Sequence, residues 1–454
     1  MEKTYKRLSF LNKKLANRLF GGFALLAAFL PLSAKCENLR LISDEETEQY
    51  LANIIKPLYE KAGLSFYRNN IFIVDDVSLN AFVSDGNKMF VHTGTLVKAN
   101  SSNEVSGVLA HETGHIMGGH IIRQKLKSKD LSYVTLASAI LAGASAVAGQ
   151  GDAAMAVLLG GQASTLNHFV RYRTEEERSA DEAAVKLLGA TQQSTNGILS
   201  FMKKIKHENA LSGREETPYF RTHPITAERI TFFENNENIY STNADNERQF
   251  ARVKAKLKAF LQKPEQTLRE YSADTNNAQY AQAIAYMKKL DFNKAIQKIN
   301  VLLEKEPNNP FFYELKGQIM LELGRIKQAK TCFATAHNLL PYSHLMKINY
   351  AQAILEDNPS QQDAKKAIAL LKQAVNKSGN AYSWMLLAQG YGLIDDMAGA
   401  NYASAEYSLK IGNLEAAEKQ IKAAEKYEAP QSMKIKISDL KQRIKSLKNK
   451  KQVI

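Results

Sequence analysis

The sequence predicts a mainly α-helical protein that begins with a small mixed domain of helices and a short β-sheet and continues as an α-solenoid. Two patterns predict this organisation. A strand, a turn and a strand lead into a helix between residues 81 and 116, and small residues and prolines recur every 34 positions after Pro264. A chain of 454 residues with two cysteines is long enough for several domains and cannot rest on a disulfide framework.

The first 34 residues have the pattern of an export signal peptide. Six Lys and Arg residues precede an uncharged apolar run from Leu19 to about Leu32, and two small residues follow, with cleavage expected after Ala34. An uncleaved membrane anchor is the alternative. Export would place the mature chain in an oxidising compartment, where Cys36 either pairs with Cys332 or leaves it unpaired inside a helix.

A His-Glu-x-x-His motif at His111, Glu112 and His115 carries the strongest chemical signal. Ser101 and Glu104 form a capping-box pattern ahead of it, so the motif is expected inside a helix. Residues four positions apart share a helix face, so the two imidazoles can bind one metal ion while Glu112 points toward the same site. This arrangement predicts a zinc hydrolase with one Zn²⁺ per chain, in which Glu112 takes the proton of the attacking water.

A catalytic zinc also needs a third protein ligand and an open fourth position. A histidine at position 121 would complete one known pattern, but Ile121 stands there and His120 comes one residue early. The better candidates are Glu177 and Asp181, which lie four positions apart, so one carboxylate can bind the metal while the other orients a ligand histidine. By spacing alone, this acidic segment could equally be a solvated helix start.

The larger pattern consists of the motif from His111 to His115, then Glu177-x-x-x-Asp181, then a Thr-His-Pro segment at His223 and finally Arg229. It resembles the zinc metalloprotease family that includes HtpX and the CAAX-prenyl endopeptidases. The resemblance implies a zincin-like α+β domain in which Glu177 is the third zinc ligand and Asp181 supports the site. It also implies that His223 lies near the metal, as a regulatory extra ligand or as a catalytic partner of the transition state, and Arg229 could lie in the same cleft.

Together with the export signal and the repeats, the resemblance implies a periplasmic zinc endopeptidase in the quality control of outer-membrane proteins. Its expected substrates are unfolded or stalled barrel proteins, and the barrel assembly machinery is a candidate partner. A rival hypothesis is a non-enzymatic chaperone or scaffold whose zinc site is closed by His223. A third is proteolysis within a membrane, because residues 131–151 carry no charge, although they are rich in Ala, Gly and Ser.

Residues 81–83 and 89–91 have the pattern of two strands joined by a turn. In zinc proteases of similar build, an edge strand just ahead of the metal helix holds the substrate backbone by strand addition. We assign this role to the segment formed by Lys88, Met89, Phe90, Val91, His92 and Thr93. The alternative is a structural hairpin without substrate contact.

After Pro264 the pattern becomes one of helix pairs with a tetratricopeptide period. The residues that repeat at 34 positions are Ala283, Gly317 and Ala351, then Ala295 and Ala329, then Pro307 and Pro341. Small residues let paired helices pack closely, and the prolines end the second helix of each pair. We therefore expect a metalloprotease domain at 35–264 and a repeat domain at 265–432 that binds a protein in its concave groove.

The formal net charge of +14 is concentrated at the two ends of the chain. Residues 433–454 hold eight Lys and Arg against one Asp, and the leader is also basic, so the parts between them are nearly balanced. Apolar residues at helical spacing predict that 433–454 form a basic capping helix, with peripheral contact to an anionic membrane surface as a further possibility. Basicity without a recognition motif gives no support to nucleic-acid binding.

Overall fold

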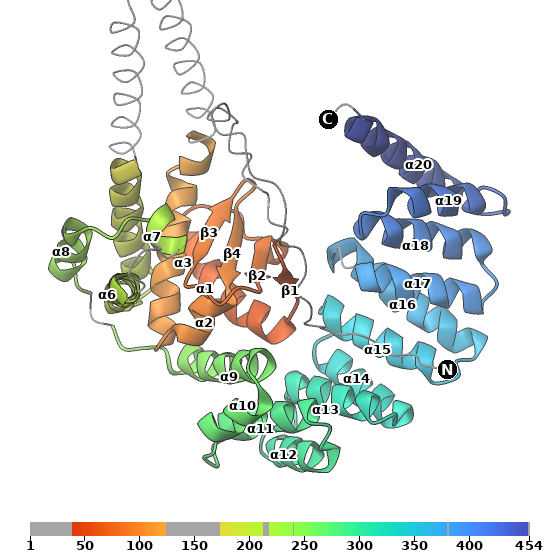
Figure 1. Ribbon diagram of the computed structural model, residues 1–454, viewed down its shortest axis with the longest axis horizontal. Helices are drawn as coiled ribbons and strands as arrows, with labels where there is room; N and C mark the ends of the chain where they lie inside the picture. Colours follow the sequence, from red (N-terminus) through yellow and green to blue (C-terminus); the bar gives the residue numbers. More distant parts are fainter. Residues whose placement is uncertain (1–38, 124–172, 212–217, 239, 379–380, 453–454) are drawn as a thin grey trace, which may run out of the picture. The chain divides into compact units, whose positions relative to one another are not determined.

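The computed structural model describes residues 39–123, 173–211, 218–238, 240–378 and 381–452 (Figure 1). The expected leader, Cys36 and the uncharged segment at 131–151 lie outside the described residues. Among the helices inside these ranges, none is both long enough and apolar enough to cross a membrane. Cys332 is buried as a free thiol.

The N-terminal region combines helices with a small sheet, as the sequence predicts. Its elements are β1 (Leu41–Ile42), α1 (Glu45–Lys61), a 3₁₀ turn (Arg68–Asn70), β2 (Ile71–Val74), β3 (Ala81–Ser84), β4 (Lys88–His92), α2 (Thr93–Lys98) and α3 (Ser102–Met117). The strand order is β1-β2-β4-β3, with β2 and β4 parallel and the other neighbours antiparallel. The predicted turn joins β3 to β4 through Gly86 and Asn87, whose φ angles are 73° and 57°.

Both faces of this sheet are apolar. Residues such as Ile73 and Val83 join the core formed with α1 and α3. On the opposite face, Phe72 and Phe82 each stack on Phe90, with ring centroids 4.8 Å apart in both pairs. Because successive side chains of a strand point to opposite faces, the strands read as continuous apolar runs rather than as an alternating pattern.

β4 is an interior strand, which corrects the prediction that residues 88–93 form the edge that holds a substrate. β2 pairs along one side of β4 and β3 along the other, so the backbone groups of β4 are already bonded. Thr93 belongs to α2 and not to the strand. The strand that ends the sheet beside α3 is β3. The hairpin itself is present as predicted. Its second strand, β4, also pairs in parallel with β2, so β4 lies inside the sheet and not at its edge.

Further helices complete this region. They are a helix covering residues 173–190, α6 (Asn196–Leu211), α7 (Pro218–Thr222) and α8 (Ala227–Asn235). α6 packs along α3, and its Ile198, Phe201 and Met202 enter the same core as the sheet. Most of α3 is therefore buried, which removes the motif histidines from bulk water.

α9 (Ala244–Leu261) belongs to both parts of the chain. Phe250 and Leu257 join the core of the sheet region, whereas Ala255 and Ala259 join the core beneath the first repeat helices. α10 (Pro264–Glu270) follows, with its proline in the first turn. The boundary expected at residue 264 thus comes directly after a helix that both regions share.

The repeat region is a succession of helix pairs (Figure 1). Its helices are α11 (Asn276–Lys288), α12 (Phe292–Lys305), α13 (Pro310–Glu322), α14 (Ile326–Leu339), α15 (His344–Glu356), α16 (Gln361–Ser378), α17 (Ala381–Leu393), α18 (Met397–Lys410), α19 (Leu414–Ala424) and α20 (Gln431–Gln452). The first helices of the first three pairs begin at Asn276, Pro310 and His344, which reproduces the 34-residue period.

The residues that predicted this period occupy the expected places. The four repeating alanines at 283, 295, 329 and 351 are fully buried, and the Phe333 ring packs directly against Gly317. α12 ends at Lys305, just before Pro307, and α14 ends at Leu339, just before Pro341. The repeats therefore pack through small residues and are punctuated by proline.

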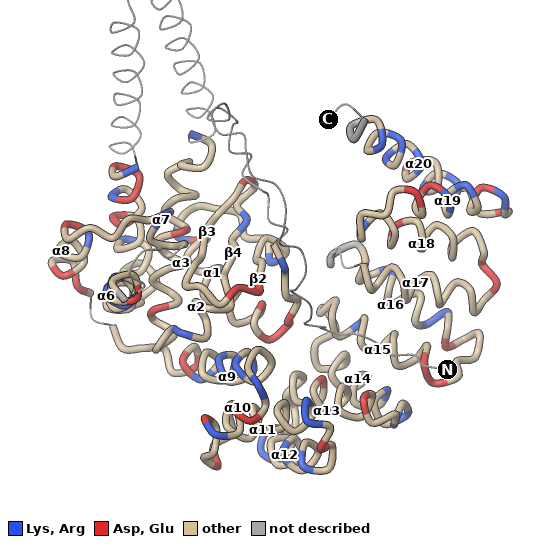
Figure 2. Tube along the Cα trace, in the orientation of Figure 1, with Lys and Arg blue, Asp and Glu red and all other residues tan. Residues whose placement is uncertain are grey.

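α20 is the basic helix expected at the C-terminal end. Its Ile437, Leu440 and Ile444 are buried in a cluster with residues of α18 and α19. Basic positions recur along α20 (Figure 2). Several of these cations pair with acids of α18 and of the segment from α19 to Glu425, namely Lys441 with Glu425, Arg443 with Glu406 and Lys448 with Glu418. This internal pairing reduces the charge that α20 can offer to an anionic membrane, and membrane contact stays a prediction.

Acidic residues at the start of α1 connect the sheet region to the repeats. Tyr280 of α11 donates to Glu46 Oε2 at 2.9 Å, and Ser343 donates to Glu45 Oε2 at 2.6 Å. Lys256 of α9 is buried and pairs with Glu46 at 3.3 Å. Carboxylates are favoured at a helix N-terminus. Here the carboxylates of Glu45 and Glu46 are also buried and accept hydrogen bonds from residues of the repeat region. These bonds help to position α1.

Candidate metal centre

α3 presents His111, Glu112 and His115 from a fully formed helix. Ser101 caps its N-terminus, with Oγ accepting from the Glu104 amide at 3.3 Å, and Glu104 Oε2 accepts from the amide of Asn100 at 3.0 Å. The predicted capping box is therefore present, although Glu104 accepts from the amide of the residue before the N-cap and not from the N-cap amide itself. The Nε2 atoms of His111 and His115 approach to 3.1 Å.

The helix covering residues 173–190 supplies Glu177 and Asp181. Gly114 of α3 allows the two helices to meet, because a side chain there would lie 2.7 Å from the carbonyl oxygen of Ala180. Glu177 Oε2 lies 3.3 Å from His111 Nε2, on the side that faces the other donors. Asp181 Oδ1 lies 2.8 Å from His111 Nδ1, on the opposite side of that ring.

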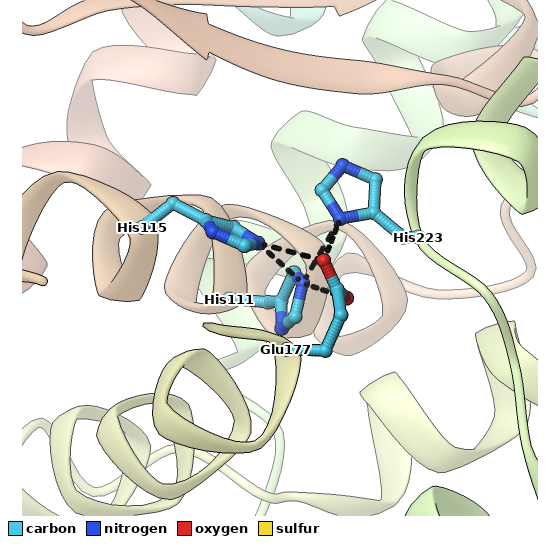
Figure 3. A group of neighbouring side chains, drawn as sticks. All are labelled: His111, His115, Glu177 and His223. Carbon is cyan, nitrogen blue, oxygen red and sulfur yellow. Dashed lines mark hydrogen bonds and ion pairs between the residues drawn. The ribbon is translucent and has the colours of Figure 1, made fainter. Parts of the chain in front are cut away.

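His223 enters the centre from the segment that follows α7. Its Nδ1 lies 3.0 Å from Glu177 Oε1 and 3.4 Å from His111 Nε2 (Figure 3). Its Nε2 lies 3.4 Å from Glu112 Oε1. The ring of Tyr219, one helical turn earlier, packs on that of His223 with a centroid distance of 4.7 Å. The structure thus brings together four of the residues that the sequence placed at or near a metal.

These four residues fit a metal ion. One ligand atom from each of His111, His115, Glu177 and His223 lies within 4.8 Å of the others, and all four residues are buried. Tetrahedral bonds of about 2.0–2.1 Å, typical of zinc, require neighbouring donors to be about 3.4 Å apart. Five of the six donor pairs lie 3.0 to 3.4 Å apart when either oxygen of Glu177 is counted. Lone pairs at such distances repel unless a cation or a proton lies between them.

The electrostatics of the centre support the same assignment. Burial lowers the pKa of His115 to about 3, so this imidazole is neutral, as a metal ligand must be. Burial acts on His111 in the same direction, but Asp181 and Glu177 outweigh it and raise its pKa to about 9. Metal binding must therefore displace a proton from His111. Burial raises the pKa of the Glu112 carboxyl, which favours proton uptake there.

Glu112 is placed beside the donor group but is not part of it. Its carboxylate is 1% exposed, and within the described part of the chain Oε2 has no hydrogen-bond partner. A buried carboxylate oxygen without a partner is costly in a structural role. Its position beside a metal donor set suits a group that exchanges a proton with substrate or water.

Arg229 of α8 lies behind the donors. Its Nε and Nη2 donate to Asp181 at 2.6 and 2.8 Å, and Nη1 lies 2.9 Å from Glu177 Oε2 and donates to the carbonyl of Pro224 at 2.8 Å. Although burial opposes it, this contact lowers the pKa of Asp181. A catalytic role for Arg229 is still a prediction. Its contacts favour a positioning role, because these donors are directed at other site residues.

Sequence reasoning missed two residues of the centre. His120 is fully buried, and its Nδ1 lies 2.8 Å from Nδ1 of His115. Tyr219 is also fully buried and packs on His223. Gly118 and Gly119, which end α3 and reverse the chain, were the available signal for His120, whereas nothing in the sequence singles out Tyr219.

Comparison with known proteins agrees with this geometry. The family model for peptidase family M48 matches residues 45–237. The chain is 24% identical over 416 residues to the β-barrel assembly-enhancing protease of Escherichia coli (strain K12), covering 88% of this chain and 82% of the relative. It is also 24% identical over 197 residues to the mitochondrial metalloendopeptidase OMA1 of Schizosaccharomyces pombe, covering 42% of this chain and 53% of that protein.

Among solved structures, a thermophilic tetratricopeptide-repeat protein of Thermus thermophilus matches 42% of this chain and 93% of its own, with 18% identity and a TM-score of 0.25. The matched region at 45–237 contains every candidate metal donor described above. Residues 45–237 therefore resemble peptidase family M48, and the chain carries a metalloendopeptidase domain.

Proposed function

We propose that this protein is a zinc-dependent endopeptidase of the periplasm that degrades unfolded or stalled outer-membrane barrel proteins. The observation that carries the proposal is the buried Glu112 carboxylate beside a donor set of three imidazoles and one carboxylate. Such a set of nitrogen and oxygen donors is typical of zinc. We expect one zinc ion per chain, held by His111, His115 and Glu177.

The chain's own groups account for the proton transfers of peptide hydrolysis. When bound, a zinc ion polarises the scissile carbonyl and acidifies the attacking water. Glu112 accepts the proton of that water on its carboxylate and donates it to the leaving amine. Asp181 holds His111 through Nδ1, and Arg229 holds both Asp181 and Glu177. These contacts keep the donors in one geometry during turnover.

His223 decides whether the centre is open. A catalytic zinc has three protein ligands and a free position, whereas a structural zinc has four. His223 Nδ1 lies at the fourth donor position in the arrangement described. We propose that His223 withdraws from this position when a substrate enters. His223 lies on the short segment between α7 and α8, so it belongs to a different part of the backbone from the other donors.

The substrate backbone is proposed to add to β3. This strand ends the sheet beside α3, and among the described strands it pairs only with β4. A sheet edge binds an extended chain through main-chain hydrogen bonds and is tolerant of sequence. Barrel proteins that await assembly expose unpaired strands of this kind. The relatives named as β-barrel assembly-enhancing proteases support this substrate class.

The repeats are proposed to recruit a client or the barrel assembly machinery, and a chaperone activity could accompany proteolysis. Their helix pairs match the period of arrays that bind proteins. The second candidate function, a non-enzymatic chaperone or scaffold, is favoured by one observation. With His223 bound, the four donors would form a closed structural site.

The test measures cleavage of an unfolded barrel protein by purified wild type, Glu112→Gln and His223→Ala, with metal content determined for each. We expect zinc in all three and a loss of about 10²–10⁴-fold in cleavage for Glu112→Gln. Equal cleavage by wild type and Glu112→Gln would refute the mechanism. If wild type is silent, activity released by His223→Ala supports a displaceable histidine, and continued silence favours the scaffold. His337→Ala, in α14, is the control for loss of a histidine away from the centre.

A further inference from the structure

His120 makes a close contact with a candidate metal ligand that the proposed mechanism does not use. Its Nδ1 is 2.8 Å from Nδ1 of His115, and both rings are buried. Two imidazole nitrogens at this distance share a single proton, so one ring donates and the other accepts. The question is which ring carries that proton.

The other side of His115 answers it. Its Nε2 faces Nε2 of His111 at 3.1 Å and Glu177 Oε1 at 3.4 Å, so the lone pair that a metal needs is on Nε2. Nδ1 of His115 then carries the proton, and Nδ1 of His120 accepts it. We infer that His120 is a positioning residue that fixes the tautomer and the ring orientation of His115. This inference rests on the proposed metal centre.

The chain reversal at the end of α3 makes this contact possible. The helix ends at Met117, and Gly119 has a positive φ of 61°, which reverses the chain. A side chain at Gly118 would lie 2.2 Å from Nε2 of His120. A glycine pair is therefore required for the ring of His120 to turn back onto His115.

The two ligand histidines of α3 are thus held by different groups. Asp181 accepts from Nδ1 of His111 at 2.8 Å, and His120 accepts from the same atom of His115 at the same distance. A carboxylate withdraws the proton more strongly than a neutral imidazole does, so the two ligands receive different support. His120 completes the outer contacts of the centre on the side that Asp181 does not reach.

A merely space-filling role for His120 makes the opposite prediction in a pair of variants. His120→Phe keeps a ring of similar volume but offers no acceptor to His115. His120→Asn loses volume but keeps an oxygen near the position of Nδ1. If the hydrogen bond matters, the Phe variant is the damaged one, and if packing matters, the Asn variant is.

The readout is zinc affinity of the purified full chain, measured by competition with a chromophoric chelator, with thermal unfolding of the metal-free forms as a check on folding. We expect His120→Phe to weaken zinc binding about 10–100-fold, and His120→Asn and the control His337→Phe to stay within about threefold of wild type. His120→Leu, which also lacks an acceptor, replaces the Phe variant if that variant does not fold.

Tight zinc binding by wild type with an unchanged affinity in His120→Phe would overturn the role of His120 alone. The reverse order, with His120→Asn the weaker binder, would assign the residue to packing and would overturn it as well. Absence of zinc binding by wild type would instead refute the metal centre on which the inference rests.

Discussion

Arg229 offers the sharpest test of how the centre is held together. Its guanidinium bonds to both oxygens of Asp181 at 2.6 and 2.8 Å and lies 2.9 Å from Glu177 Oε2, and the three residues are at most 7% exposed. Arg229→Met keeps most of the side-chain volume but removes the guanidinium from two buried carboxylates, which then share only His111 as a cation. Breaking a buried ion pair by removing one partner costs about 3–5 kcal/mol.

The loss is large compared with the stability of a domain of this size. The free energy of unfolding of natural domains is about 5–15 kcal/mol. In a domain of about 150–250 residues, each kcal/mol of lost stability lowers the melting temperature by about 2–4 °C. We therefore expect the metal-free Arg229→Met variant to melt about 6–20 °C below wild type, as measured by circular dichroism. Bound zinc should restore part of the difference, because its charge replaces that of the guanidinium.

Arg178 provides the matched control. It lies on the same helix as Glu177 and pairs with Glu182 at 3.2 Å, but its side chain is 79% exposed. Arg178→Met should cost less than about 1 kcal/mol. Adding Asp181→Asn to Arg229→Met removes one of the two carboxylates that lost the guanidinium and should recover part of the loss. A melting temperature for Arg229→Met within a few degrees of wild type, or equal to that of Arg178→Met, would refute this account.

Three further predictions follow from close contacts and buried charges. Gly118→Ala displaces His120 from its position and should weaken zinc binding measured by chelator competition, although no ligand is changed; an unaltered affinity would contradict the proposed support. Burial raises the pKa of Glu314 to about 7, so the native state binds more protons than the unfolded state from about pH 4.5 to 7 and its stability falls as the pH rises through that window. Glu314→Gln should reduce the difference between the free energies of unfolding measured with urea at about pH 5 and at about pH 8. A wild type that is equally stable at both pH values would contradict this prediction. Gly317→Ala gains about 1 kcal/mol of helix propensity but drives its methyl to 2.6 Å from the buried Phe333 ring, so the urea midpoint should fall, whereas a rise would show that the ring can move aside.

Helix-based features were predictable because their determinants are local. The capping residues and the apolar faces of α3 lie within a few turns of each other, and the hydrogen bonds of a helix join residues four apart. The repeat period was predictable for the same reason, since each helix pair is built from neighbouring residues and its small residues recur at 34 positions. The resemblance of the separated motifs to a known family then supplied Glu177 and His223, which spacing alone left open.

The sheet was not predictable to the same depth. The segments at 81–84 and 88–92 do form the expected hairpin, but pairing between strands depends on residues far away in the chain. β2 inserts beside β4 in parallel, so the edge passes to β3. A strand's sequence records that both of its faces are apolar, yet it does not record which neighbour lies on each side.

The sequence by itself determined the motif helix, its paired histidines, the acidic helix and the repeat array, because each depends on periodicity along one element. Only the tertiary structure decided that β3 ends the sheet beside α3, that Arg229 supports Asp181 and Glu177, and that His120 turns back onto His115. Those contacts join elements whose separation in the chain is unrelated to their distance in space. They are set by how helices and strands pack around one core, which no local pattern encodes.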